Sequence, residues 1–397
     1  MQGSLGFPVY LLRIDAYRSG RIARMALFDL ELVATDTRTS ARACRFTTAH
    51  GDVETPAFMP VGTRATVKGV LPQQLSALGA QVVLANAYHL FLRPGADLVA
   101  EAGGLHRFMG WDGVILTDSG GFQIFSLADT LNLTDEGVKF RSIVDGAWHF
   151  WSPEDNMRIQ EQLGADIIMQ LDQCPPYPAE RELVATAARR SAEWAQRCKT
   201  AHRREDQALF GIVQGGVHPD LRLESVERLR SIGFAGYGVG GYSVGEPHEL
   251  MLESLAPVCE ALPVDRPRYL MGVGNPTTML EAIGLGVDMF DCVLPTRTAR
   301  LGTAFSSEGR LNLRNARFAR DLGPLDAGCT CDTCVRFSRA YLRHLVNTKE
   351  MLGAILLTVH NLHYLLELTR RAREAIESGT YQGLLDEWRS SAAFDDY

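Results

Sequence analysis

Short runs of apolar and β-branched residues recur along most of the chain, separated by stretches with helical periodicity. The runs are Thr55–Val61, Gln81–Asn86, Gly113–Asp118, Ala165–Asp172, Ala208–Gln214, Gly236–Gly240, Arg268–Val273 and Gly286–Asp291. Strands that alternate with helices indicate a parallel sheet. Because the unit repeats eight times, the pattern predicts an α/β fold of the (β/α)8 (TIM) barrel type rather than an open sheet.

One interval between these strands is too long for a single connecting helix. Within it, residues 138–144 and 147–151 read as two strands, and Asp145-Gly146 stands between them. Asp-Gly favours a tight two-residue turn, so this segment predicts a β-hairpin inserted into a barrel loop. The segment from about Phe28 to Val53 also alternates, and we expect it to cap the bottom of the barrel.

Three of the apolar runs end in an aspartate: Asp118, Asp172 and Asp291. Barrel enzymes build their active sites at the C-terminal ends of their strands, so these carboxylates are candidates for one shared site. A simpler reading is available for two of them. Asp118 begins Asp-Ser-Gly, for which a turn or helix N-cap is at least as good an interpretation as catalysis. Asp172 is interpreted equally well as a loop cap.

The residues around these aspartates suit a flat ligand. Gly120 and Gly121 allow close approach to the backbone, and Phe122 offers a stacking surface. Asp172 can accept two N–H bonds from a nucleobase edge, and Gln214 adds a neutral donor and acceptor. Asp291 directly follows a strand, where a carboxylate can attack the anomeric carbon of a sugar.

Bulk properties limit the possible partners. The chain has 397 residues and a net charge of -7, so a nucleic-acid partner requires a local basic patch. Such a patch is predicted by the arginines that follow Asp291, although a run of this kind is usually a solvated face. No apolar run approaches the roughly 20 residues of a membrane span, and no signal peptide is visible. We therefore predict a cytoplasmic protein without membrane association.

A cysteine cluster near the C-terminal end is a more specific signal. Cys329, Cys331 and Cys334 follow the pattern Cys-x-Cys-x-x-Cys, which supplies three corners of a zinc tetrahedron. Either His360 or His363 can provide the fourth ligand. A closed Cys3His site has no open position, so we expect a structural zinc ion.

We divide the chain into three parts on these patterns. Residues 1–24 read as a disordered or mis-assigned extension, and residues 25–300 as the catalytic barrel with its capping strands. Residues 301–397 read as a zinc-binding and helical subdomain packed on the barrel, because Leu352, Ile355, Leu356, Val359, Leu362 and Leu366 repeat with a helical period.

From about Met25 onward the chain resembles the bacterial tRNA-guanine transglycosylases. The resemblance is carried by Asn86-Ala87-Tyr88-His89-Leu90, Leu92-Arg93-Pro94-Gly95, Asp118 to Gln123, Gly211 to Gly216, Tyr269 to Gly274, Phe290 to Arg297, Asn315 to Phe318, and the cysteine cluster with His360. This family exchanges guanine at the wobble position of tRNAs with GUN anticodons for a 7-deazaguanine, during queuosine synthesis. Its bacterial substrate is usually 7-aminomethyl-7-deazaguanine, and its members usually form homodimers.

The resemblance implies a role for each candidate residue. Asp291 corresponds to the nucleophile and Asp118 to the proton acceptor and donor. The implied substrate-binding residues are Ser119, Gly120, Gly121, Phe122, Asp172, Gln214, Gly241, Tyr242 and Met271. The implied RNA contacts are Gly272, Val273, Gly274, Asn275, Pro276, Thr277, Thr278, Thr296, Arg297, Thr298, Ala299 and Arg300. The implied zinc ligands are Cys329, Cys331, Cys334 and His360, which selects His360 over His363.

Four alternatives compete with this interpretation. Tyr242 and Val244 predict a narrow pocket, which favours 7-aminomethyl-7-deazaguanine over full-size queuine as the incoming base. A barrel glycoside hydrolase also pairs carboxylates, but it leaves the cysteine cluster and the arginines unexplained. A non-catalytic subunit is disfavoured because both Asp118 and Asp291 are present, and the archaeal type carries a long additional RNA-binding region.

Overall fold

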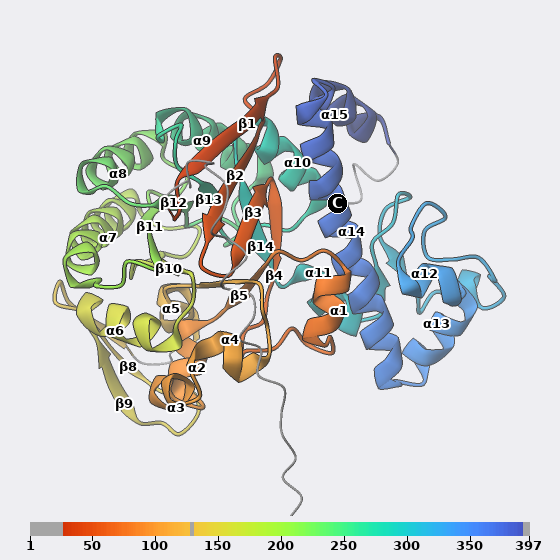
Figure 1. The fold of residues 1–397 in the computed structure, drawn as a ribbon, viewed down its shortest axis with the longest axis horizontal. Helices are drawn as coiled ribbons and strands as arrows, with labels where there is room; N and C mark the ends of the chain where they lie inside the picture. The colour runs from red at the N-terminus through yellow and green to blue at the C-terminus, as the bar shows by residue number, and fades with distance from the viewer. Residues whose placement is uncertain (1–26, 128–130, 392–397) are drawn as a thin grey trace, which may run out of the picture.

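The structure is a computed structural model that describes residues 27–127 and 131–391. The predicted extension at residues 1–24 lies outside the described residues. At the centre is a parallel sheet of eight strands with helices around it (Figure 1). Its strands are β4 (Ala57–Pro60), β5 (Val82–Ala85), β6 (Val114–Thr117), β10 (Ile167–Met169), β11 (Ala208–Val213), β12 (Gly236–Val239), β13 (Arg268–Leu270) and β14 (Met289–Cys292).

The sheet closes on itself to form a barrel. From β5 to β14 each strand pairs with the next barrel strand along the chain, and β14 pairs with β4 in parallel. The last gap, between β4 and β5, is bridged by Val61 and Leu84. The predicted (β/α)8 barrel is therefore confirmed, and each of its strands lies within a predicted apolar run except β14, which extends one residue further to Cys292.

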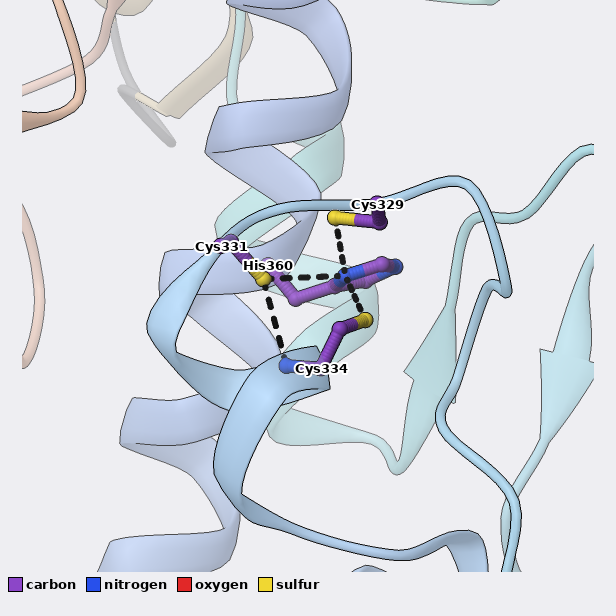
Figure 2. A group of neighbouring side chains, drawn as sticks. All are labelled: Cys329, Cys331, Cys334 and His360. Atoms are coloured by element: carbon purple, nitrogen blue, oxygen red, sulfur yellow. Dashed lines mark hydrogen bonds between the residues drawn. The ribbon is translucent and has the colours of Figure 1, made fainter.

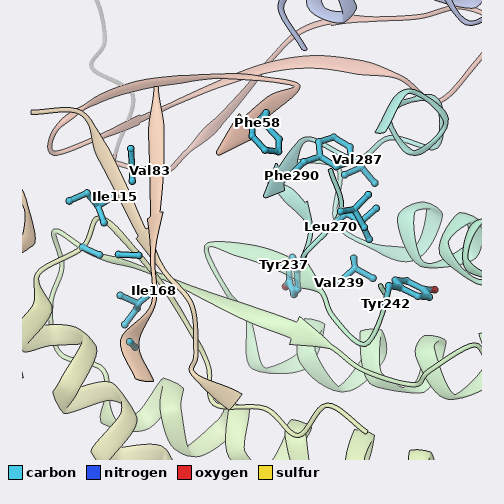
Figure 3. Close-up of a cluster of buried hydrophobic side chains, with 14 of the residues drawn as sticks. Phe58, Val83, Ile115, Ile168, Tyr237, Val239, Tyr242, Leu270, Val287 and Phe290 are labelled. Atoms are coloured by element: carbon cyan, nitrogen blue, oxygen red, sulfur yellow. The ribbon is translucent and has the colours of Figure 1, made fainter. Parts of the chain in front are cut away.

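Side chains alternate between the inside and the outside of the barrel. Val82 and Leu84 of β5 belong to the buried cluster inside the barrel, whereas Val83 belongs to the cluster beneath the helices. This outer cluster also contains Phe58, Ile115, Ile168, Leu270 and Phe290 (Figure 3). The alternation follows from the two-residue period of a strand. A polar residue that stands two positions beyond the last inward-facing side chain is therefore placed at the mouth of the barrel.

Helices cover the outside of the barrel in chain order. They are α1 (Pro72–Ala77), α2 (Ala87–Leu92), α3 (Ala96–Glu101), α4 (Gly104–Met109), α5 (Gly121–Leu127), α6 (Pro153–Leu163), α7 (Arg181–Ala201), α8 (Pro219–Ile232), α9 (His248–Ala261), α10 (Pro276–Gly284) and α11 (Leu294–Arg300). In α7 the residues Ala187, Ala192, Trp194 and Ala195 face the core, while Leu183 is exposed.

A small antiparallel sheet lies at the N-terminal ends of the barrel strands. It consists of β1 (Leu30–Thr35), β2 (Arg42–Thr48) and β3 (Gly51–Thr55). Phe46 and Val53 join the buried cluster inside the barrel. His50, in the turn between β2 and β3, contacts the buried Asp166 carboxylate at 2.7 Å and so ties this sheet to the start of β10.

The inserted hairpin is present, but its turn differs from the prediction. β8 (Val138–Arg141) and β9 (Trp148–Trp151) pair as expected, and β7 (Leu131–Leu133) adds a third strand. The predicted two-residue Asp-Gly turn is wrong, because residues 142–147 form a wider connection. The Ser142 hydroxyl accepts the N–H of Val144 at 3.1 Å, and Asp145 accepts that of Ala147 at 3.1 Å. These local side-chain bonds compete with strand pairing and shorten both strands.

The C-terminal part folds around one long helix, α14 (Met351–Glu377), which packs against α11 and β4 (Figure 1). Around it lie β15 (Thr303–Ala304), β16 (Leu311–Asn312), the 3-10 turn η2 (Ala316–Phe318), α12 (Asp332–Arg336), α13 (Arg339–Asn347) and α15 (Tyr381–Ser390). Among the described residues, α14 is the one helix long and apolar enough to cross a membrane, but it is mostly buried inside the protein. Its hydrophobicity is accounted for by packing.

Candidate active site and metal site

A cavity of about 1130 Å³ opens at the C-terminal ends of the barrel strands. It is lined by all three strand-end aspartates, Asp118, Asp172 and Asp291, together with Gln214 and Met271. Four of these five positions follow from strand alternation. Asp118, Gln214, Met271 and Asp291 each stand two residues beyond a side chain in the interior cluster, so they are the next to face inward.

Asp118 is buried at the edge of the cavity and is held by three donors. The N–H of Ala87 donates to Oδ1 at 2.9 Å, and the Gln123 amide donates to Oδ2 at 3.1 Å. The Asn86 side chain also donates to Oδ2. Burial raises the pKa of Asp118 to about 7, and the charges of Asp291 and Asp172 act in the same direction. The carboxyl group can therefore both give and take a proton near neutral pH.

Asp291 has a different hydrogen-bond environment. The Tyr269 hydroxyl donates to Oδ1 at 2.6 Å and the N–H of Gly272 donates to the same oxygen at 2.7 Å. Burial raises the pKa of Asp291, and these two donors oppose the effect. Within the described part of the chain, Oδ2 has no recorded hydrogen-bond donor. Asp291 thus has one oxygen fixed by the protein and one available for a ligand.

Asp172 is fixed from both sides. The Ser119 hydroxyl donates to its Oδ1 at 2.7 Å, and the Gln214 amide donates to Oδ2 at 2.7 Å. Burial raises the pKa of Asp172. Gly121 packs so tightly here that a Cβ would lie 2.5 Å from the Asp172 carbonyl oxygen. Any side chain at this position would therefore displace the aspartate.

The predicted walls of the pocket are also present. Phe122 is 49% exposed and lines the cavity, as does Met271. Gly241 adopts a φ of +72°, and a Cβ there would lie 2.5 Å from the Gln214 side-chain oxygen. That oxygen is buried and has no hydrogen-bond partner among the described residues. An unsatisfied buried acceptor beside the cavity favours a ligand that carries an N–H group.

The two segments with predicted RNA contacts lie at the cavity and beside it. Gly272, Val273, Gly274, Asn275, Thr277, Thr278 and Arg297 line the cavity. Asn275 caps α10 by accepting the N–H of Thr278 at 3.2 Å, and Arg300 donates to the carbonyl of Thr296 at 3.0 Å. Val273 and Ala299 are both almost completely buried.

The cysteine cluster and His360 come together as one group (Figure 2): Cys329 and Cys331 precede α12, Cys334 lies on it, and His360 lies on α14. The Sγ atoms of Cys329, Cys331 and Cys334 lie 3.6, 3.5 and 3.3 Å from Nδ1 of His360. In a zinc tetrahedron with bonds of about 2.3 Å to sulfur and 2.0–2.1 Å to nitrogen, the sulfur-to-nitrogen distance is about 3.6 Å.

The orientation of His360 also suits a metal. Its Nε2 lies 2.7 Å from the carbonyl oxygen of Phe305. A hydrogen bond donated there places the proton on Nε2 and leaves the Nδ1 lone pair directed at the three sulfurs. The four side chains therefore form a site that fits a metal ion, and His363 is not part of it.

Comparison with known proteins gives the family. A sequence model described as queuine tRNA-ribosyltransferase matches residues 36–393. The protein of that name from Desulforamulus reducens is 56% identical over 338 residues, covering 85% of this chain and 91% of the relative. The Moorella thermoacetica protein is 56% identical over 344 residues, with coverage of 87% and 92%. The Herpetosiphon aurantiacus protein is 55% identical over 350 residues, with coverage of 88% and 89%.

The chain belongs to the queuine tRNA-ribosyltransferase family. It is accordingly an enzyme of the pentosyltransferase class. Membership confirms the resemblance carried by the sequence motifs, and it excludes the barrel glycoside hydrolase.

Two side chains of this tRNA-ribosyltransferase site were given no role in the sequence analysis. Asn86 holds Asp118, and Tyr269 holds Asp291. Asn86 ends an apolar run just as the aspartates do, so the same signal was available for it. Tyr269 is an inward position of β13, where a tyrosine is easily taken for an ordinary core residue.

We predict that His360→Ala abolishes stoichiometric metal binding, because it removes the one nitrogen ligand of the group. The matched change His363→Ala, three residues further along α14, should leave the metal content unchanged. Elemental analysis of the purified variants measures both, and thermal unfolding should show a lower Tm for His360→Ala alone. Loss of metal in His363→Ala with retention in His360→Ala would contradict the ligand assignment.

Proposed function

We propose that this enzyme is a tRNA-guanine transglycosylase. It exchanges guanine at wobble position 34 of the GUN-anticodon tRNAs for Asp, Asn, His and Tyr, and the incoming base is 7-aminomethyl-7-deazaguanine, in queuosine synthesis. The observation that carries the proposal is the pair Asp118 and Asp291, a buried and a half-buried carboxylate with different hydrogen-bond environments in one cavity. Base exchange needs both a nucleophile and a proton carrier.

Asp291 serves as the nucleophile. Its Oδ1 is held by Tyr269 and Gly272, so Oδ2 is the atom that attacks C1′ of the ribose. The bond from C1′ to the guanine nitrogen breaks, and its electrons leave with the base. The product is a covalent enzyme–tRNA ester. A second attack, by the incoming base, releases the carboxylate, so two inversions give overall retention.

Asp118 serves as the proton carrier. With a pKa of about 7, it is substantially protonated near neutral pH and can protonate the departing guanine. The resulting carboxylate then accepts a proton from the incoming base. The same carboxyl group therefore acts as an acid in the first displacement and as a base in the second, so one side chain accounts for both proton transfers.

The remaining cavity residues recognise the base. Asp172, oriented by Ser119 and Gln214, accepts N–H bonds from the base edge. The N–H of Gly241 adds a donor, and Gly120 and Gly121 allow close approach. Phe122 and Met271 enclose the two faces of the base. Stacking surfaces of this kind stabilise a base that has left the anticodon stack.

The tRNA backbone is bound at the cavity mouth. Residues 272–278 and 296–300 provide these contacts, with Arg297 and Arg300 as the cationic side chains for phosphate. Arg297 lines the cavity itself, which supports this placement.

The Cys3His group holds a structural zinc ion, because its donor set is closed and soft. The ion attaches the segment that follows α11 to the helix α14. We further propose a homodimer in the cytoplasm, as the family resemblance implies.

The size and charge of the cavity support a small cationic substituent on the base. The Tyr242 hydroxyl contacts the Ser254 hydroxyl at 2.7 Å, and the Tyr242 ring packs against Arg222, so this ring is fixed. Glu246 and Glu249 also line the cavity. Their negative potential favours an aminomethyl group, which is protonated at neutral pH.

We predict that 7-aminomethyl-7-deazaguanine outcompetes queuine. The measurement is release of labelled guanine from tRNA in a competition between the two bases. The expected result is at least about a tenfold preference for the aminomethyl base, equivalent to roughly 1.4 kcal/mol. Equal use of both bases would contradict the narrow-pocket interpretation.

Asp291→Asn is predicted to abolish the denaturation-resistant enzyme–tRNA complex, because the amide is a poor nucleophile. Asp118→Asn is the matched control, since it changes a neighbouring carboxylate in the same way. It should bind tRNA with nearly unchanged affinity and reduce base exchange by roughly 10²–10⁴-fold. Denaturing gel electrophoresis and tRNA binding measure the two effects. A covalent complex in Asp291→Asn would show that the nucleophile is misassigned.

The rate of guanine release should depend on the protonation of Asp118. Since its folded-state pKa is raised to about 7, the acid form is lost as pH rises through this value. In single-turnover experiments the release rate should fall about tenfold per pH unit above pH ~7. Asp118→Asn should lack this decline. A wild-type rate that rises through the same range would contradict the acid role.

A further inference from the structure

Arg222, in the first half of α8, is a buried cation without an acidic partner. Its side chain is fully buried, and within the described residues no carboxylate forms an ion pair with it. Removing a guanidinium from water is costly unless its donors are satisfied. The residue does not line the cavity, so it cannot contact a ligand directly. Its placement therefore needs another explanation.

The guanidinium of Arg222 donates hydrogen bonds to the glycine-rich turns at the cavity. Nε donates to the carbonyl of Gly216 at 2.5 Å, and both terminal nitrogens donate to the carbonyl of Gly240 at 3.0 Å. The guanidinium also stacks over the Tyr242 ring, 3.6 Å from its centre. One side chain thus joins the turn after β11 to the turn after β12. A planar group with five donors suits this task, and a lysine does not.

These contacts determine the direction of one peptide group. The carbonyl of Gly240 and the N–H of Gly241 belong to the same peptide, which is not among the cis bonds of the chain. In a trans peptide the C=O and N–H groups point in opposite directions. Because the Gly240 carbonyl points to Arg222, the N–H of Gly241 points away from it. Gly241 lines the cavity, whereas Arg222 lies behind it.

We propose that Arg222 is a positioning residue for base recognition: it holds the Gly240–Gly241 peptide so that the Gly241 N–H points into the cavity and donates to the base. The inference rests on the proposed function. Glycine at 241 lets the turn adopt its positive φ, but the same freedom would let an unbraced peptide rotate. Arg222 removes that freedom.

The acceptor on the base follows from the two substrates of the exchange. Guanine and a 7-deazaguanine share the exocyclic carbonyl oxygen, whereas only guanine has the N7 acceptor. A fixed N–H donor that serves both half-reactions must therefore bind the carbonyl oxygen. Replacing this oxygen by sulfur, as in 6-thioguanine, keeps the neighbouring N–H and weakens the acceptor.

The test compares wild type with Arg222→Met and Arg222→Lys. Arg228→Met is the matched control, because Arg228 lies on the same helix and pairs with Glu224 at the surface. For each protein, competition against labelled base gives the inhibition constants of guanine and 6-thioguanine. Binding of tRNA and the Tm are measured alongside. Wild type and Arg228→Met should both bind guanine more tightly than 6-thioguanine.

In Arg222→Met the affinity for guanine should fall roughly tenfold, and the preference for guanine over 6-thioguanine should shrink by roughly 3- to 10-fold, since the lost interaction is one hydrogen bond. Affinity for tRNA should stay within about twofold. Arg222→Lys should be intermediate, because an ammonium can retain one of the bonds. If Arg222→Met does not fold, Arg222→Lys decides the test.

A purely structural role gives a different result. The affinities for guanine and for 6-thioguanine would then fall by the same factor, so the ratio of their inhibition constants would be unchanged while the Tm falls. This result would overturn the inference. If the wild type exchanges no guanine at all, the proposed function itself fails, and the inference fails with it. An active wild type whose preference is unaffected by either Arg222 change overturns the inference alone.

Discussion

The removal of three carboxylates from water into one cavity is the constraint on which the site depends. Asp118 and Asp172 are buried and Asp291 is half-buried, and the loss of contact with water raises the pKa of all three. Each can be kept there only if nearby donors stabilise it. The barrel supplies those donors from neighbouring strands. The differences among the donor sets explain how three identical side chains come to have three different properties.

The donor sets divide the work. Burial, together with the charges of its two acidic neighbours, raises the pKa of Asp118 to about 7, which suits proton transfer. Asp291 has both of its recorded donors on one oxygen, so the other oxygen is available to a ligand. Asp172 is bonded through both oxygens to Ser119 and Gln214, and its position is thereby fixed for recognition.

Much of this arrangement could be predicted from the sequence. The apolar runs predict the barrel, and their polar last residues predict the mouth, because side chains alternate along a strand. Asp172 does not follow by alternation, since β10 ends at Met169 and the chain leaves the strand before it. Tyr269 and Arg222 were missed for a related reason. Their importance lies in contacts between segments far apart in the chain, which a one-dimensional pattern does not contain.

The choice between His360 and His363 illustrates the same limit. Both lie on α14, and spacing alone left them equivalent. The fold separates them because the carbonyl of Phe305 accepts a hydrogen bond from His360 and turns Nδ1 toward the cysteines. The width of the hairpin turn was likewise decided by side-chain bonds from Ser142 and Asp145, which outweighed the Asp-Gly preference.

The central claim is that this cavity exchanges a base in tRNA without cutting the chain. The most direct measurement is incubation with labelled guanine and a GUN-anticodon tRNA, followed by nuclease mapping of the label. The account predicts intact tRNA labelled only at position 34, and no label in a tRNA with adenine at that position. Failure of the wild-type enzyme to incorporate guanine, or incorporation at another position, would contradict it.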